Sequence, residues 1–209
     1  GPSIIHFYDW AEKSGTYGHF IDPGAFLNLD KAKSHGLTLA RRPTGGGIVF
    51  HLSDLAFSVL VPSNSPHFSI NTLENYDFIN NRVKMALKDF LDEANLSLLP
   101  KEPSPLDKSC QHFCMAKPTK YDVMIGGRKV AGAAQRRRAQ GYLHQGTIAI
   151  ALPSKKILQD VLLPNTKVEE AMQQNTFSIL GSDPSDKELK EVRYELKKQL
   201  KEHLTKELE

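Results

Sequence analysis

Paired strand-like segments constrain the fold of this chain more than any other feature. Residues 48–52 and 55–61 are short apolar runs joined by a brief polar turn, and residues 121–125 and 128–134 are joined by Gly126-Gly127. Two apolar runs with such a turn between them predict a β-hairpin. Residues 4–8, 37–41 and 145–152 are further strand candidates. We therefore expect mostly antiparallel strand pairing.

Helical patterns lie apart from these hairpins. Apolar side chains recur at three- and four-residue spacing from Tyr76 to Ala94, and Asn71 or Thr72 can cap this helix. Ser185 and Glu188 form a capping-box pattern before a stripe of leucines that ends at residue 208. Shorter helices are predicted at 29–35 and 155–162, and loops at 14–24 and 97–119. Separate hairpins and helices are typical of the α+β class.

Composition and charge exclude several classes of protein. The 209 residues are 40% hydrophobic, which is enough for a sizeable core, and the net charge of +3 does not indicate a protein that coats nucleic acid. No apolar run approaches the roughly 20 residues of a membrane helix. Cys110 and Cys114 are too few for a disulfide scaffold, and their spacing is poor evidence for zinc. We expect a cytoplasmic protein with no nucleic-acid or membrane partner.

A glycine-rich segment is the first candidate for chemistry. Arg41-Arg42-Pro43-Thr44 is followed by Gly45-Gly46-Gly47 and then by the strand candidate Ile48-Val49-Phe50-His51. Consecutive glycines let a backbone come close to a ligand and present N–H groups to an anion. Arginine supplies forked donors for phosphate or carboxylate. The same run is also typical of a tight turn with solvated arginines.

Three further residues have both a chemical and a structural interpretation. Lys129 precedes the small residues 130–134, so it is either a solvated edge charge or a cation directed into a site. His144, before Gln145-Gly146-Thr147, is either a site residue or a structural histidine. Cys114 lies in a polar loop near Lys117 and is either a small apolar residue or a nucleophile.

Taken together, in this order and spacing, these segments resemble the lipoate–protein ligase A family of the biotin/lipoate A/B protein ligase superfamily. The resemblance covers about residues 4–180. It implies an α+β fold with a mixed, largely antiparallel curved sheet and helices packed on it. It also implies a ligase that activates lipoate with ATP and Mg²⁺ to lipoyl-AMP. The lipoyl group then passes to a lysine of a lipoyl carrier domain, in a 2-oxoacid dehydrogenase complex or the glycine cleavage H protein.

The resemblance also implies roles for individual residues. Lys129 corresponds to the family's central lysine, which bridges the acyl carbonyl and the phosphate, and we expect it to contribute little to packing. The nucleotide or lipoyl-AMP is expected to contact Arg42, Gly45, Gly46, Gly47, Ile48, Val49, Phe50 and Lys129. The acyl substrate is expected near His51, Ala131, Gly132, Ala133, His144, Gly146 and Thr147.

The chain departs from the family pattern in two ways. Full ligases have a strand and helix before the position of Ile4 and often a C-terminal accessory domain. We therefore expect one catalytic domain over residues 1–209, without the N-terminal strand and helix and with no C-terminal accessory domain beyond a helix at 185–208. Cys114, seven residues before Tyr121, matches a related group of octanoyltransferases. Those enzymes carry octanoate on a cysteine, from one carrier protein to another, without ATP.

The choice between these activities depends on two positions. The octanoyltransferases usually have Cys-Phe here and an arginine after two glycines, whereas this chain has Cys114-Met115 and a third glycine, Gly47. We therefore expect the ATP-dependent lipoate ligase. A Cys114-dependent octanoyltransferase and a non-catalytic lipoyl-binding homologue are the alternatives.

Overall fold

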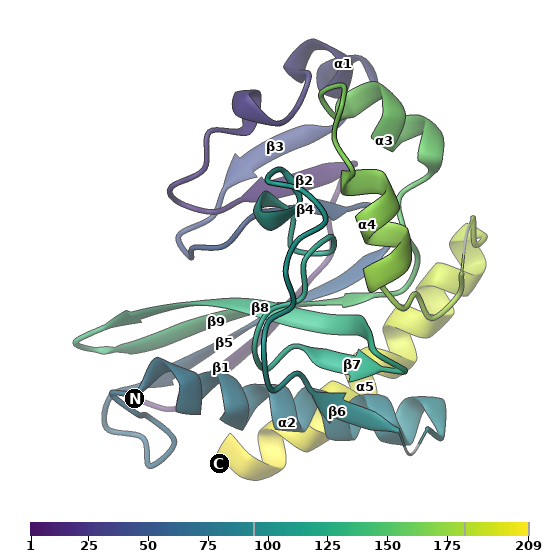
Figure 1. The fold of residues 1–209 in the computed structure, drawn as a ribbon. Coiled ribbons are helices and arrows are strands. Elements are labelled where there is room, and N and C mark those ends of the chain that lie inside the picture. Colours follow the sequence, from purple (N-terminus) through teal and green to yellow (C-terminus); the bar gives the residue numbers. More distant parts are fainter. Residues whose placement is uncertain (94, 182, 209) are drawn as a thin grey trace.

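The strands form two sheets in the computed structural model, which describes residues 1–93, 95–181 and 183–208 (Figure 1). The larger sheet has six strands, and every neighbouring pair in it is antiparallel. Its order is β1 (Ile4–Tyr8), β5 (Asp54–Pro62), β9 (Gly141–Ala149), β8 (Arg128–Arg138), β7 (Val123–Ile125) and β6 (Leu96–Leu98). The smaller sheet has the order β3 (Thr38–Arg41), β2 (Ser14–Tyr17), β4 (Ile48–His51). Its β2–β3 pair is parallel, so the predicted mixed, largely antiparallel α+β fold is confirmed.

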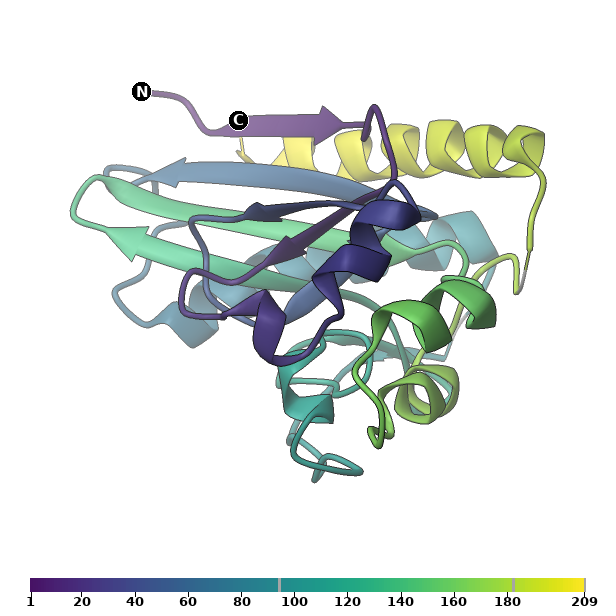
Figure 2. The same ribbon diagram turned by 90° about the horizontal axis from the view of Figure 1, so that it is seen from above.

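Helices lie on both sides of the large sheet. The helices α2 (Thr72–Leu91) and α5 (Asp186–Leu208) cover one face of it, and α5 runs alongside β1 (Figure 2). On the other side, with the small sheet, lie α1 (Leu29–Ser34), α3 (Lys155–Val161) and α4 (Val168–Asn175). Short 3₁₀ turns occur at Pro23–Ala25 and Cys110–His112. None of the helices in the described ranges has the length and hydropathy needed to cross a membrane.

The packing follows the periodicity of the sequence. Alternate residues of β5, namely Leu55, Phe57, Val59 and Val61, are at most 1% exposed and point toward α2 and α5. The stripe on α5 buries Leu196, Leu200 and Leu204 completely in the same core. Burial of each such side chain stabilises a fold by roughly 1.5–3 kcal/mol. A second core joins the small sheet to α1, α3 and α4.

The predicted caps and the glycine turn are confirmed. The side chain of Asn71 accepts the N–H of Leu73 at the start of α2. Ser185 and Glu188 bond to each other at the start of α5, since each backbone N–H donates to the other's side chain. Gly126 and Gly127 both have positive φ, +54° and +78°, in the turn between β7 and β8. Ala94, the end of the predicted helical spacing, lies outside the described residues.

Several predictions about elements were wrong. The segments 48–52 and 55–61 form no hairpin, because β4 pairs with β2 while β5 pairs with β1 and β9. The chain turns a corner between the sheets at Ser53, whose hydroxyl donates to the carbonyl of Ala151 (2.9 Å). The predicted loops contain β2, most of β6 and the turn at residues 110–112, and helix α4 was not predicted.

Candidate active site

A cavity of about 450 Å³ is lined by residues of both sheets and by the loop that carries Cys114. The small sheet and its glycine-rich connection contribute Arg42, residues 45–47, Val49 and His51. The large sheet contributes Lys129 and the consecutive residues 132–135 and 145–147. The side chains of α2 that reach the cavity are Leu73 and Tyr76, near the N-terminus of that helix.

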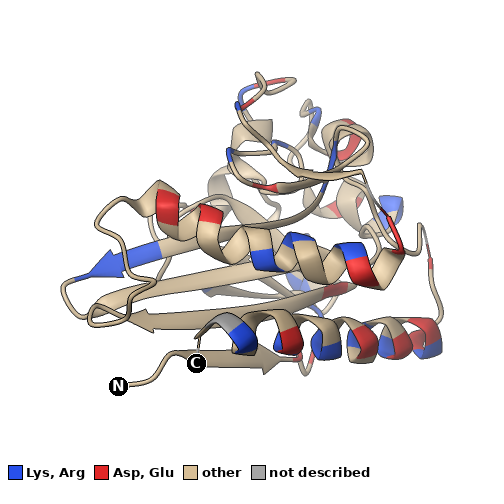
Figure 3. Ribbon diagram, turned by 90° about the horizontal axis from the view of Figure 1, so that it is seen from below, with Lys and Arg blue, Asp and Glu red and all other residues tan. Residues whose placement is uncertain are grey.

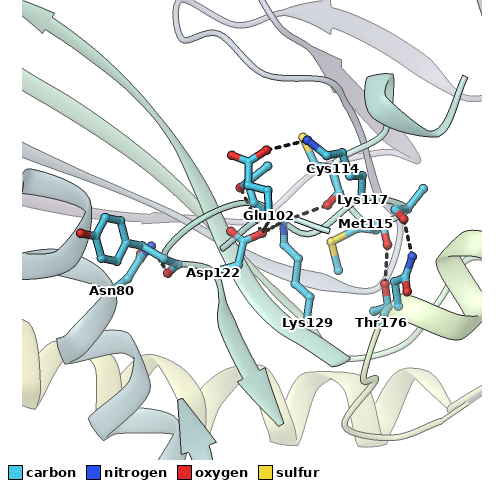
Figure 4. Close-up of polar contacts among 12 residues, drawn as sticks. Asn80, Glu102, Cys114, Met115, Lys117, Asp122, Lys129 and Thr176 are labelled. Atoms are coloured by element: carbon cyan, nitrogen blue, oxygen red, sulfur yellow. Dashed lines mark hydrogen bonds and ion pairs between the residues drawn. The ribbon is translucent and has the colours of Figure 1, made fainter. Parts of the chain in front are cut away.

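Backbone contacts on two sides hold Cys114 at this cavity. Its N–H donates to the carbonyl of Ile48 in β4 (3.1 Å). On the other side the Thr176 hydroxyl donates to the carbonyl of Met115 (2.8 Å), as Figure 4 shows. Cys114 is half-buried and is not in a disulfide. The thiol is therefore fixed at the cavity while remaining accessible from it.

The third glycine has a structural explanation. A Cβ atom at Gly47 would lie 2.3 Å from the carbonyl oxygen of His112, in the loop that carries Cys114. Such a distance is far inside van der Waals contact, so only glycine lets this loop approach β4. Gly46 has φ +84°, in the left-handed region that favours glycine. Gly47 is thus required by the packing of the cysteine loop.

Arg42 places a positive charge beside Cys114. Its side chain is buried, and Nη2 donates to the carbonyls of Gly45 (2.8 Å) and Gly47 (2.7 Å). The same nitrogen lies 3.9 Å from Cys114 Sγ. The guanidinium therefore fixes the glycine-rich loop and can stabilise negative charge on the sulfur, or on an acyl group attached to it.

Lys129 lies in a buried ion pair next to Cys114 (Figure 4). Its ammonium is 2.7 Å from Asp122 Oδ2 and donates to the backbone carbonyl of Cys114 (2.8 Å). Lys129 and Asp122 are only 3% and 2% exposed. Burial raises the pKa of the Asp122 carboxyl, against the opposing effects of Lys129 and of the Thr119 N–H. A Cβ at Gly132 would lie 2.5 Å from both Lys129 Nζ and Asp122 Oδ1, so glycine leaves the room for this pair.

A chain of hydrogen bonds joins His51 to Arg42. His51 Nδ1 lies 2.7 Å from Asp54 Oδ2, and its Nε2 lies 2.8 Å from the hydroxyl of Thr16. That hydroxyl accepts a bond from Arg42 Nη1 (3.2 Å). The ring of Trp10 stacks on His51, with 4.4 Å between centroids. His51 thus lines the cavity and also belongs to the framework that orients Arg42.

Tyr76, Gln135 and His144 form a second polar group at the α2 side. The hydroxyl of Tyr76 accepts the backbone N–H of Gln135 (2.7 Å), and burial raises the pKa of Tyr76 to about 12. The Gln135 side-chain nitrogen lies 2.8 Å from His144 Nδ1. Burial lowers the pKa of His144 to about 3, so this histidine is neutral at pH 7.

The cavity brings most of the predicted site residues together. The predicted residues that line it are Arg42, Gly45, Gly46, Gly47, Val49, His51, Cys114, Lys129, Gly132, Ala133, Gly146 and Thr147. Four others do not line it: Ile48, Phe50 and Ala131 belong to the apolar cores, and His144 is fully buried behind Gln135. Alternation along β4 explains the first two, because Val49 and His51 face the cavity and their neighbours face the core.

Sequence reasoning assigned no role to several partners of these residues, although Asp122 and Gln135 lie in the segments that carry the resemblance. Trp10, Thr16, Tyr76 and Gln135 line the cavity, and Asp122 is buried behind its wall, where it pairs with Lys129. Asp122 carried a usable signal, as an acidic residue directly before a strand whose hairpin partner begins with a lysine. Thr16 and Trp10 had no comparable signal, since tertiary packing alone brings them to the cavity. Among the described residues, no group of three or more His, Cys, Asp or Glu is placed to hold a metal ion.

Comparison with known proteins gives consistent matches. The family model for the lipoyl protein ligase A/B catalytic domain matches residues 1–184. Octanoyltransferase LipM of Bacillus subtilis is 30% identical over 176 residues, which are 83% of this chain and 63% of that protein. LipM of Lysinibacillus sphaericus is 31% identical over 159 residues, 75% of this chain and 58% of that protein. The chain thus spans less than two thirds of the length of these curated relatives.

Solved structures show the same fold. A T. acidophilum protein with bound lipoic acid matches with a TM-score of 0.68 and 25% identity, over 97% of this chain and 73% of the other. A lipoate-protein ligase A bound with ATP matches with a TM-score of 0.64 and 26% identity, over the same shares.

The relatives correct the expected activity. These curated homologues are octanoyltransferases, so the expectation of an ATP-dependent lipoate ligase was wrong. Their names give no support for ATP or Mg²⁺ as cofactors. The two departures that favoured the ligase, Gly47 and Met115, did not discriminate between the activities. Gly47 follows from the packing of the cysteine loop. The fold, the matched family model and these relatives show that the chain belongs to the lipoyl protein ligase A/B catalytic domain family.

Proposed function

We propose that this chain is the catalytic part of an octanoyltransferase that carries the acyl group on Cys114. The observation that carries this proposal is the setting of the thiol. Cys114 Sγ lies at the cavity, 3.9 Å from the Arg42 guanidinium, and the Lys129 ammonium is bonded to the carbonyl of the same cysteine. The octanoyltransferase names of the homologues support the same activity.

The reaction takes two acyl transfers. In the first, the Cys114 thiolate attacks the carbonyl carbon of an octanoyl thioester, and the donor's sulfur leaves as a thiolate that takes up a proton. In the second, the neutral amine of an acceptor lysine attacks the acyl-Cys114 thioester. The amide bond forms, Cys114 leaves as a thiolate, and the amine proton passes to solvent. No nucleotide enters either step.

Two fixed cations suit this chemistry. Each transfer passes through a tetrahedral intermediate whose oxygen is negatively charged, and preorganised donors stabilise that charge. We assign this role to Arg42, the cation next to the sulfur, and a supporting role to Lys129, which also fixes the cysteine loop. Loss of such a donor typically costs roughly 100- to 1000-fold in rate.

The substrates follow from the proposed activity. The octanoyl chain fits the apolar part of the cavity, which includes Leu73, Phe113 and Ala133. We propose an octanoyl carrier protein as donor and a lipoyl domain as acceptor. The structure of a bi-partite lipoate protein ligase from Thermoplasma acidophilum was reported with its E2 lipoyl domain, and it shares this fold (TM-score 0.66, 24% identity). We propose the cytoplasm as the location, because the reaction needs Cys114 as a free thiol.

Mass spectrometry tests the proposal directly. The chain is incubated with octanoyl carrier protein without ATP, and its peptides are searched for an octanoyl adduct on Cys114. The Cys114→Ser variant should form no adduct and transfer nothing to a lipoyl domain, because a serine hydroxyl is far less ionised near neutral pH. Cys110→Ser is the matched control, since Cys110 does not line the cavity and a serine hydroxyl can keep the hydrogen bond that its side chain makes to Asp107. Lipoylation that requires ATP and survives in Cys114→Ser would contradict the proposal.

A further inference from the structure

One face of the large sheet carries both the cavity and a second, separate hollow. Cross-strand partners of β1, β5, β9 and β8 form rows, and residues two apart on each strand share a face. The row Tyr8, Ala56, Thr147 and Gly132 contributes three residues to the cavity. Four residues further along each strand, the same face carries the row Ile4, Leu60, Leu143 and Arg136. Arg138 follows two residues later on β8.

This second region, which we call the Leu60 surface, consists of Ile4, Leu60, Leu143, Arg136 and Arg138. It surrounds a hollow of about 400 Å³. Ile4 is 54% exposed and Leu60 is 45% exposed, which is unusual for large apolar residues side by side on a sheet. Arg136 is tied to the active-site loop, because its Nη1 donates to the carbonyl of Pro43 (2.9 Å).

The strands and loops that form the Leu60 surface carry charge of one sign. The segments that build this end of the sheet, residues 1–8, 55–73 and 123–159, contain no Asp or Glu. Figure 3 shows the blue end of β8 beside neighbouring strand ends that carry no acidic residue. Arg136, Arg137 and Arg138 form no ion pair with any residue that the structure describes. An apolar surface bordered by unpaired arginines fits an acidic partner with exposed apolar side chains.

We propose that the Leu60 surface docks the acidic carrier that delivers the acyl thioester to Cys114. This inference rests on the proposed function, because it names the donor for the same site. Arg136 and Arg138 bind carboxylates of the carrier, and its apolar side chains cover Ile4 and Leu60. The acyl group then reaches the cavity along the face that the two regions share.

Distance favours the donor over the acceptor as the occupant. A Cβ placed on Gly46 would touch both Cys114 Sγ (3.8 Å) and Ala134 Cβ (3.7 Å), so Ala134 marks the position of the thiol on β8. Arg138 lies four residues further along that strand, roughly 13 Å at the usual rise of a strand. A long, flexible prosthetic arm spans such a gap. The four-carbon stem of an acceptor lysine does not, so the acceptor must dock closer to the cavity.

The tests use two adjacent arginines. Arg138 and Arg137 are both exposed, but they point to opposite faces of β8, so Arg137→Glu is the matched control for Arg138→Glu. Binding of a carrier protein that bears its arm but no acyl group is measured by calorimetric titration. Loading of Cys114 is measured with octanoyl carrier protein and with octanoyl N-acetylcysteamine, a small thioester that needs no docking.

We expect Arg138→Glu to weaken carrier binding and slow carrier-dependent loading on the order of tenfold, and added salt to reduce this difference. Loading from the small thioester should not change, which also shows that the variant is folded. Equal effects of the two substitutions would overturn the inference, as would lost binding of a lipoyl domain in place of the carrier. If neither thioester loads Cys114 in the unaltered chain, the proposed function fails. The titration alone then decides the docking: binding that Arg138→Glu weakens supports it, and any other result refutes it.

Discussion

Replacing Lys129 by methionine should destabilise the chain by about 3–5 kcal/mol. Lys129 and Asp122 are both almost completely buried, 2.7 Å apart. Removing one partner of such a pair leaves the other charge buried without compensation, and measured losses are of this size. A domain is stable by only about 5–15 kcal/mol in total, so the loss is a large part of its stability. This differs from the expectation that Lys129 contributes little to the fold.

A second substitution distinguishes the cost of an unpaired buried carboxylate from the cost of lost packing. In the double variant Lys129→Met, Asp122→Asn no charge remains buried at this position, and most of the lost stability should return. Urea denaturation at pH 7, followed by circular dichroism, gives the free energy of unfolding of all three proteins. Equal losses in the single and double variants would refute the reasoning, because the cost would then come from packing and not from an unpaired carboxylate.

The pH dependence gives an independent check. In Lys129→Met the Asp122 carboxyl loses the ammonium that opposes the effect of burial, so its folded-state pKa lies further above the unfolded value of about 3.9. Between these two values the folded state binds more protons than the unfolded state, so stability falls as the pH rises through that range. The unaltered chain should show a shallower fall, and the double variant none from this position. A flat profile for the single variant would contradict the assignment.

Two further predictions concern Gly47, which lines the cavity, and His144, which is buried behind Gln135. Gly47→Ala should cost about 1–3 kcal/mol and slow the acylation of Cys114, because its Cβ would press on the His112 carbonyl 2.3 Å away and displace the cysteine loop. An unchanged melting temperature together with an unchanged loading rate would count against this contact. His144 has a folded-state pKa of about 3, below its usual 6.5, so stability should fall as the pH drops through that range, by at most about 1.4 kcal/mol per pH unit. His144→Gln should remove that part of the slope, and an identical slope in the variant would show that another group causes it.

The two predicted hairpins show where sequence reasoning works and where it stops. The β7–β8 hairpin is fixed locally, because Gly126 and Gly127 supply the positive φ angles that such a turn needs. The polar turn before Asp54 looks similar in sequence, yet Ser53 bonds to Ala151, far along the chain, and the two strands enter different sheets. Strand β2 escaped prediction because Ser14–Tyr17 has no apolar alternation. Long-range pairing decides both outcomes.

The candidate site shows the same division. Arg42, Lys129 and Cys114 could be selected because their residue types and their surroundings in the sequence are informative. The contacts that define the roles of these residues could not be predicted from the sequence. Tertiary packing alone brings the Arg42 guanidinium to Thr16 and Cys114, and Lys129 reaches the carbonyl of Cys114 across a fold that no local pattern describes.

The close fit at Gly132 restricts the order in which this site can change. A side chain at position 132 collides with Lys129 and Asp122 together, so no substitution there is tolerated while both keep their size and place. Mutational scanning will therefore score position 132 as intolerant even if nothing bound in the cavity ever touches it. A larger residue at 132 should be tolerated only in libraries that vary positions 122 and 129 at the same time. The effects of the three substitutions on stability should then be strongly non-additive.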